Sequence, residues 1–190
     1  MKSTMRNMVL SLTVITTAMA AVLAWIHQLT ETPIAEARLR AKTEALQQVL
    51  PPFDNDLLST AKNVTVEGDV SPVTIYTATK DGYVTGYAVE SRTMDGFSGE
   101  IQVMVGFDTS GAVTGYKVLE HNETPGLGAK ADEWFRDPTG SRSIIGTDTP
   151  LKVSKDGGNV DGITAATITS RAFLDAVNRA RKGIEDSHIN

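Results

Sequence analysis

Apolar residues follow three different patterns along this chain of 190 residues. The first is an uncharged, largely apolar run from Met8 to Ile26, with Trp25 near its end and His27 directly after it. As an α-helix, with a rise of about 1.5 Å per residue, the run would be roughly 28 Å long, which matches the hydrocarbon core of a bilayer. We therefore predict a short N-terminal stub and a transmembrane anchor within residues 1–29.

Charged residues flank this run asymmetrically. Lys2 and Arg6 precede it, whereas Glu31 and Glu36 follow it. Positively charged flanks tend to stay on the cytoplasmic side of a membrane. We therefore expect a single-pass protein of the cytoplasmic (inner) membrane, with its N-terminus in the cytoplasm and its main domain on the periplasmic or extracellular side.

A cleaved signal peptide is the alternative interpretation of the same run. Ala18-Met19-Ala20 fits the small-x-small pattern of a cleavage site. The apolar character continues beyond this point to Ile26, which favours a retained anchor. Both interpretations place the remainder of the chain outside the cytoplasm.

The second pattern is helical and covers residues 30–52. Thr32 is a favourable N-cap and Pro33 a favourable first helical residue, so a separate helix is expected to begin here. Apolar residues then recur at near-helical spacing up to Val49, and Pro51-Pro52 would end the helix. This predicts a juxtamembrane helix that leads into the domain.

The third pattern is the alternation of short β-strands, which begins after residue 52. Asp81-Gly82 is typical of a tight hairpin turn, and the segment from Asp108 to Gly111 predicts a second turn. The predicted strands cover residues 73–79, 83–89, 100–107 and 112–119.

The remaining elements follow a loop that begins after Glu120. A short helix is expected at residues 132–135, a strand near Leu151 to Val153, and an amphipathic helix from about Ser170 to Ile184. The predicted fold class is α+β: an antiparallel sheet flanked by helices, within a domain of residues 53–190.

Composition narrows the chemistry. The chain has no cysteine, which excludes disulfides, thiol catalysis and cysteine-ligated iron–sulfur clusters. His27, His121 and His188 are scattered without metal-ligand spacing, so no metal site is expected. The net charge of −5 offers no basic field for nucleic acid. If the protein transfers electrons, an organic cofactor must carry them.

The segment from Asp161 to Thr167, with the sequence Asp-Gly-Ile-Thr-Ala-Ala-Thr, directly precedes the last helix. Its small side chains allow a ligand to approach the backbone closely, and a helix start offers free N–H groups to a phosphate. These residues by themselves predict an anion site with a reactive hydroxyl, Thr167. The alternative role for Thr167 is a simple helix cap.

Two further motifs precede this segment. Residues 123–128 have the sequence Glu-Thr-Pro-Gly-Leu-Gly, a rigid turn with a carboxylate at one end and glycines on which a flat ligand could pack. Residues 96–101, Gly-Phe-Ser-Gly-Glu-Ile, lead into an apolar strand. We interpret this second motif as a turn into the core, with Phe97 near a ligand.

In this order, the motifs resemble those of the FMN-binding domain family of bacterial ion-pumping electron-transfer complexes. The segment of residues 161–167 matches the family's Asp-Gly-x-(Ser/Thr)-(Gly/Ala)-Ala-Thr pattern, in which the final Thr carries FMN through a phosphoester. Over nearly the whole chain, the similarity is to the G subunits of the Rnf ferredoxin:NAD⁺ oxidoreductases. The C subunits of the Na⁺-translocating NADH:quinone reductases share these features but are generally longer.

The resemblance implies roles for individual residues. Thr167 would hold FMN covalently, and Asp161 would help to place Mg²⁺ and the FMN donor for a modifying flavin transferase; otherwise Asp161 is a turn residue. Thr164 would contact the phosphate or act as a second cap. Ala165 departs from the usual Gly, and its methyl group disfavours a positive φ. The expected FMN-binding residues are Thr167, Asp161, Gly162, Thr164, Ala165, Ala166, Glu123, Thr124, Pro125, Gly126 and Leu127, of which residues 123–127 would line the isoalloxazine.

The implied function is electron relay between neighbouring subunits of a membrane complex that transfers electrons from ferredoxin to NAD⁺ and moves Na⁺ or H⁺. Expected partners are the other membrane and peripheral subunits, the flavin transferase and membrane lipid, and no turnover is expected from the chain alone. The alternatives are a C-type subunit, a membrane-anchored scaffold without a redox role, and a stand-alone flavin reductase. We expect Trp134 to pack in the core or form a cofactor wall, and His121 to lie in a surface loop.

Overall fold

The computed structural model describes residues 4–66 and 71–187. Lys2 and His188, which enter the sequence-based arguments above, lie outside these ranges. The chain divides into two compact units, Met1–Ala41 and Lys42–Asn190. The first contains most of helix α1, and the second contains the sheet and the remaining helices.

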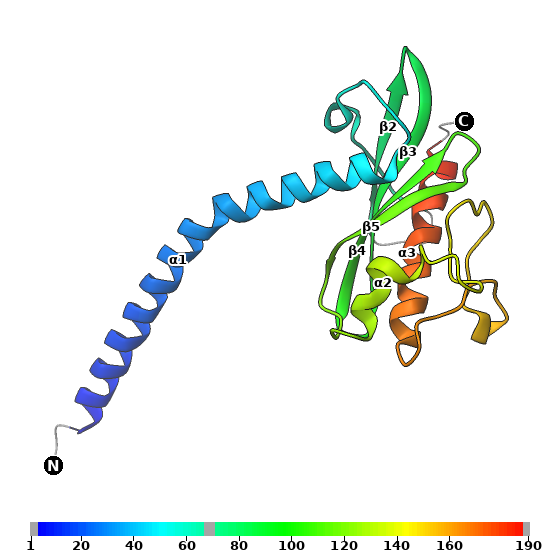
Figure 1. Ribbon diagram of the computed structural model, residues 1–190. Coiled ribbons are helices and arrows are strands. Elements are labelled where there is room, and N and C mark those ends of the chain that lie inside the picture. Colours follow the sequence, from blue (N-terminus) through cyan, green and yellow to red (C-terminus); the bar gives the residue numbers. More distant parts are fainter. Residues whose placement is uncertain (1–3, 67–70, 188–190) are drawn as a thin grey trace. The chain divides into compact units, whose positions relative to one another are not determined.

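Helix α1 extends without interruption over Thr4–Val49 (Figure 1). The expected new helix start at Thr32 and Pro33 is therefore wrong: Pro33 lies inside α1. Pro33 lacks the N–H for one helical hydrogen bond and its ring crowds the carbonyl of Leu29, but the helix-forming residues on both sides continue the helix despite that local cost. The predicted end before Pro51-Pro52 is confirmed.

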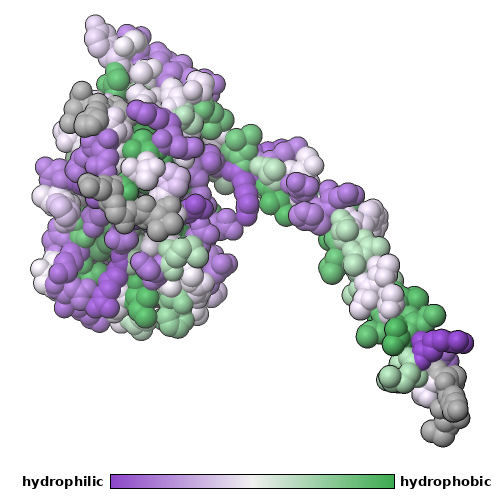
Figure 2. Space-filling model, turned by 180° about the vertical axis from the view of Figure 1, so that it is seen from behind, coloured by the Kyte–Doolittle hydropathy of each residue, from purple (hydrophilic) through white to green (hydrophobic). Residues whose placement is uncertain are grey.

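The apolar run lies within α1, the single helix of the described residues that is long and apolar enough to cross a membrane. Its large apolar side chains, such as Val9, Leu12 and Leu23, are exposed in the protein itself. In Figure 2, hydrophobic side chains are prominent along the N-terminal half of this helix, whereas hydrophilic ones become frequent towards its C-terminal half. Exposed apolar surface on this scale requires a nonpolar surrounding.

In the part of the chain that the structure describes, five antiparallel strands form one sheet in the order β1-β2-β3-β4-β5. The predicted hairpin at Asp81-Gly82 is confirmed, and both residues have positive φ (53° and 81°), as a type I′ turn requires. The strands are β1 (Lys62–Val64), β2 (Val73–Lys80), β3 (Tyr83–Gly96), β4 (Gly99–Asp108) and β5 (Val113–His121).

Both faces of the sheet are covered, so side chains on either face of the central strands are buried. On one face, the buried side chains Ala45, Leu46 and Val49 of the end of α1 pack against a cluster that includes Met104. Gly106 makes room for this contact, because a Cβ there would lie 2.0 Å from the carbonyl oxygen of Val49. An ion pair joins α1 to the same face of the sheet: Lys42 Nζ lies 2.8 Å from a Glu90 carboxylate oxygen.

Helix α3 (Thr167–Asp186) covers the other face of the sheet (Figure 1). Its Phe173 stacks on Phe135 at a centroid distance of 4.6 Å and meets the edge of Tyr116 at 4.9 Å. The hydroxyl of Tyr116 donates a 2.8 Å bond to the carbonyl of Ala131, which fixes the short helix α2 (Ala131–Trp134) against β5.

The predicted α+β class and the four main strands are confirmed, with several local corrections. Residues 151–153 form no strand; Val153 makes only an isolated bridge with Val160. Helix α3 begins at Thr167, three residues before its predicted start. Short elements carry little periodicity, so the sequence did not predict β1 or the 3₁₀ helices η1 (Leu57–Thr60), η2 (Gly128–Lys130) and η3 (Ser154–Asp156).

Candidate functional site

A pocket of about 320 Å³ lies where three segments meet: the β3–β4 turn, the loop after β5, and the start of α3. It brings together residues of all three motifs that the sequence singled out, although Glu123 and Thr167 are far apart in the chain. Its lining consists of Phe97, Glu123, Thr124, Leu127, Gly128, Ala165, Ala166, Thr167, Ile168 and Thr169. Of the residues expected to bind FMN, Pro125, Gly126, Asp161, Gly162 and Thr164 are not part of this lining.

Glu123 holds the three segments together. Its side chain is buried, and its Oε1 accepts a 3.0 Å hydrogen bond from the backbone N–H of Ser98 in the β3–β4 turn. Its Oε2 accepts a 2.7 Å bond from the hydroxyl of Thr169 in the first turn of α3. The backbone N–H of Glu123 donates to Nδ1 of His121 at 3.1 Å. His121, expected in a surface loop, is instead the last residue of β5 and is half-buried.

Two glycines make space for this carboxylate. A Cβ at Gly128 would lie 2.5 Å from Glu123 Oε2 and 2.7 Å from Thr169 Oγ1. A Cβ at Gly96 would lie 2.8 Å from Glu123 Oε1. Gly128, in the motif of residues 123–128, and Gly96, in the motif of residues 96–101, therefore allow a buried carboxylate to reach its partners. Glu123 and Thr169 form a polar pocket floor that their hydrogen bond holds in place.

The rim of the pocket is apolar and exposed. Phe97, Leu127 and Ile168 are 67%, 41% and 49% exposed, respectively, and one comes from each of the three segments. Large apolar side chains around a concave site favour binding of a flat, partly apolar ligand. Phe97, from the motif of residues 96–101, thus lines this pocket.

Helix α3 begins at the pocket without a side-chain cap. Thr167 is its first residue, and Ala166, at the N-cap position, has no side chain that could accept a hydrogen bond. The first backbone N–H groups of a helix have no partner within the helix and carry partial positive charge. Thr167 itself is half-buried, and its hydroxyl lies 3.5 Å from Nζ of Lys155. The alternative role of Thr167 as the capping side chain is therefore not what the structure shows.

The segment before α3 depends on small residues. Ala165 has a φ of 63°, a left-handed conformation that Gly adopts without strain and that costs Ala a steric penalty. Gly162 has no such φ; its role is close packing, because a Cβ there would lie 3.0 Å from Val153 Cγ1. Ser170 closes the turn by accepting a 2.8 Å bond from the N–H of Ile163.

The carboxylate and the carbonyl of Asp161 both accept hydrogen bonds from other parts of the chain. Its carboxylate accepts bonds from the backbone N–H of Ser141 (3.1 Å) and the hydroxyl of Ser154 (3.0 Å). Its carbonyl accepts a 2.8 Å bond from Nε1 of Trp134, which packs half-buried against the core beneath Arg142. These bonds support the turn-residue interpretation of Asp161. Within the described residues, no group of three or more His, Asp or Glu side chains could hold a metal ion.

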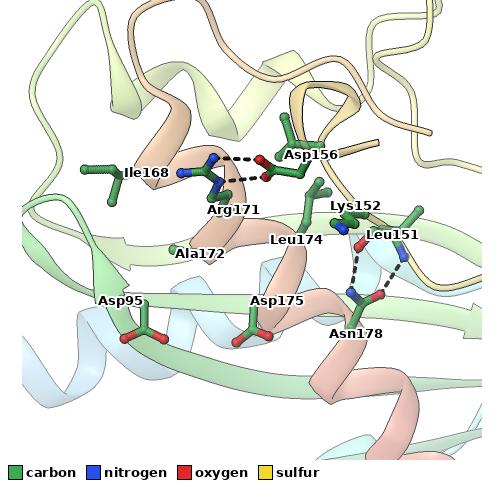
Figure 3. Close-up of a pocket in the computed structure, with 11 residues that line it drawn as sticks. Asp95, Leu151, Lys152, Asp156, Ile168, Arg171, Ala172, Leu174, Asp175 and Asn178 are labelled. Atoms are coloured by element: carbon green, nitrogen blue, oxygen red, sulfur yellow. Dashed lines mark hydrogen bonds and ion pairs between the residues drawn. The ribbon is translucent and has the colours of Figure 1, made fainter. Parts of the chain in front are cut away.

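A second pocket, of about 430 Å³, lies beside the same end of α3 and shares Ile168 with the first (Figure 3). Arg171 and Asp156 form a bidentate ion pair there, with both N–O distances at 2.7 Å. The hydrogen bonds from Arg171 hold the pKa of Asp156 below its ordinary value. Asn178 binds the N–H and the carbonyl of Leu151, which ties this loop to α3.

Sequence reasoning missed several residues that shape the site: Thr169, Lys155 and Arg171. Thr169 carried a weak signal, as a hydroxyl two positions after Thr167 at the start of an amphipathic helix. Lys155 carried none, because its approach to Thr167 is a product of tertiary structure.

The residues present fit a phosphate-linked flavin. An uncapped helix start suits the phosphate, a hydroxyl lies at the first helical position, and an apolar rim with a polar floor suits a flat ring system. Thr167, Ala166 and Ala165 would hold the phosphate end, and Phe97, Leu127 and Ile168 would hold the ring system.

Comparisons with known proteins identify an FMN-binding domain in this chain. Residues 96–182 match the FMN-binding domain family, and residues 1–49 match the RnfG N-terminal region. The chain is 37% identical to the G subunit of the ion-translocating oxidoreductase complex of Photorhabdus laumondii, over 94% of this chain and 90% of that protein. The corresponding G subunits of Yersinia pestis and Escherichia coli O157:H7 are 37% and 36% identical, over 95% of this chain and 90% and 91% of theirs. The chain therefore belongs to the family of G subunits of the ion-translocating oxidoreductase complexes.

Proposed function

We propose that this chain is the membrane-anchored, FMN-carrying electron-transfer subunit of an ion-translocating oxidoreductase complex. The observation that carries the proposal is that Glu123 and Thr167, from two separate motifs, line one pocket in a chain of this family. The complex would transfer electrons from ferredoxin to NAD⁺ and couple this to Na⁺ or H⁺ transport. Its other membrane and peripheral subunits would be the electron donors and acceptors of this chain.

We further propose that FMN is attached covalently, through a phosphoester to Thr167. Bound FMN would supply reversible one- and two-electron chemistry. The chain would position the cofactor. The uncapped start of α3 would bind the phosphate, and the pocket floor of Glu123 and Thr169 would limit how deeply the ring system enters. A covalent bond would keep the cofactor in place on an exposed protein surface. A flavin transferase is required for this modification.

The membrane arrangement belongs to the same proposal. The apolar part of α1 would span the lipid bilayer with Arg6 on the cytoplasmic side, and residues 42–190 would lie on the periplasmic or extracellular side. On this side the chain would meet the flavin transferase and neighbouring subunits.

The test is Thr167→Val in the full-length chain, co-expressed with a flavin transferase and purified from membranes. Valine keeps the shape of threonine but removes the acceptor hydroxyl. The wild-type chain should gain the mass of one FMN less one water and remain fluorescent in a denaturing gel, and Thr167→Val should do neither. Thr149→Val, at an exposed loop position, is the matched control and should be modified like the wild type.

Intact mass also reports whether the N-terminal run is retained. A wild-type chain that stays colourless under these conditions would contradict the proposal and favour a scaffold without a redox role. Modification of Thr167→Val would show that the flavin is attached elsewhere.

A further inference from the structure

Lys155 approaches Thr167 from a different part of the chain. It is the middle residue of η3 (Ser154–Asp156), and its Nζ lies 3.5 Å from the Thr167 hydroxyl. The side chain is exposed, and among the described residues it forms no ion pair with a carboxylate. A lysine in this position has its charge available for another anion.

The backbone around Lys155 is held in place on both sides. Before it, the hydroxyl of Ser154 donates a 3.0 Å bond to the carboxylate of Asp161, at the start of the Thr167 motif. After it, Asp156 forms the bidentate pair with Arg171, one helical turn beyond Thr167 (Figure 3). These two attachments connect η3 to both flanks of the Thr167 segment. The position of the Lys155 backbone beside the Thr167 segment is therefore set by the fold.

The local charges show what Lys155 contributes. Asp156 neutralises Arg171, and the carboxylate of Asp161 lies on the opposite flank of η3. Lys152 also acts electrostatically on Asp156, but Lys155 is the cation that contacts the Thr167 hydroxyl. A phosphate group at that hydroxyl would be attracted by the ammonium group of Lys155.

We infer that Lys155 binds the phosphate during the modification of Thr167 and remains its charge partner in the finished phosphoester. This inference rests on the proposed function. Esterification needs an activated phosphate, which FAD provides as FMN joined to AMP through a phosphoanhydride. The Thr167 oxygen forms a bond to the phosphorus on the flavin side, the phosphoanhydride bond breaks, and AMP leaves with the hydroxyl proton. Lys155 orients the attacking oxygen and offsets the charge of the incoming phosphate.

The experiment measures the rate of modification. Full-length chain in detergent is incubated with purified flavin transferase, FAD and Mg²⁺, and the fraction carrying FMN is followed by intact mass. Lys155→Gln removes the charge and keeps much of the length of the side chain. Lys155→Arg restores the charge. Lys152→Gln is the matched control, because Lys152 lies in the same loop and lines the neighbouring pocket instead of the one that contains Thr167.

We expect Lys155→Gln to slow modification by about three- to fivefold, the upper part of the range for one exposed charged contact. Lys155→Arg should restore most of the rate, and Lys152→Gln should stay within about twofold of the wild type. An unchanged rate for Lys155→Gln, or equal slowing by Lys152→Gln, would overturn the inference while leaving the proposed function intact. If the wild-type chain takes up no flavin, the proposed function fails and the inference falls with it.

Discussion

The hydrogen bond between Thr169 and Glu123 offers the most direct test of how the site is held together. Thr169 is 1% exposed and Glu123 is 6% exposed, and their oxygens are 2.7 Å apart. Thr169→Val replaces the hydroxyl by a methyl group of similar size. It removes one donor from a buried carboxylate without opening a cavity, so its effect isolates the bond itself.

The expected loss of stability follows from the charge and burial of the acceptor. A hydrogen bond to a charged group contributes about 1.5–3 kcal/mol, and its loss leaves one oxygen of the Glu123 carboxylate without its partner. We therefore expect Thr169→Val to lower the free energy of unfolding by about 2 kcal/mol. For a domain of this size, each kcal/mol corresponds to about 2–4 °C, which gives a fall in midpoint temperature of about 4–8 °C.

The assay is thermal and urea unfolding of the full-length chain in detergent. The chain has two tryptophans, and a Trp25→Phe background leaves only Trp134, which packs against the core of the domain. Fluorescence then reports the unfolding of residues 42–187. The control is Thr149→Val, an exposed threonine whose substitution should change stability by no more than about 0.5 kcal/mol.

A double-mutant cycle with Glu123→Gln identifies the partner. If the two side chains act through the observed bond, their effects should fail to add by about 1 kcal/mol or more. A Thr169→Val chain that unfolds at the wild-type midpoint would refute the assignment of Glu123 as the residue that joins the three segments of the pocket.

Two further predictions concern the turn and loop beside Thr167. Ala165→Val should lower the free energy of unfolding by about 1–2 kcal/mol because a β-branched residue is strained at a φ of 63°, whereas Ala165→Gly should not lower it; equal losses in urea midpoint for both variants would contradict this. The pKa of Asp156 is held below its ordinary value of 3.8 by Arg171, so the ion pair stabilises the fold above that pH and its contribution is lost as pH falls through the lowered pKa. The protection of the amides of residues 153–160 against hydrogen exchange, relative to their intrinsic exchange rates, should therefore fall in acid below the ordinary pKa, and this acid-dependent loss should be absent in Asp156→Asn.

Short sequence patterns were sufficient to predict the elements that depend only on interactions between neighbouring residues. Alternating apolar residues and the Asp81-Gly82 turn predicted the central hairpin, because the type I′ turn and the period of two are properties of a few adjacent residues. The apolar run from Met8 to Ile26 predicted a membrane-length helix from its length and composition alone.

Predictions from short sequence patterns were wrong where residues outside the pattern determine the secondary structure. Thr32 and Pro33 have the pattern of a helix start, yet α1 continues through them, since the flanking residues sustain the helix on both sides. The segment of residues 151–153 has strand-like composition but forms only one bridge, because it lies outside the sheet and is fixed by Asn178 instead.

The sequence by itself determined the motifs of this protein: an apolar segment of membrane length, the carboxylate of Glu123 and the hydroxyl of Thr167. Only the tertiary structure decided that Glu123 and Thr167 line one pocket, that Thr169 and Ser98 fix the carboxylate, and that Lys155 reaches the hydroxyl. The reason is that periodicity and turn chemistry act over a few residues. Contacts between segments tens of residues apart depend on how the two faces of the sheet are covered, which no local pattern encodes.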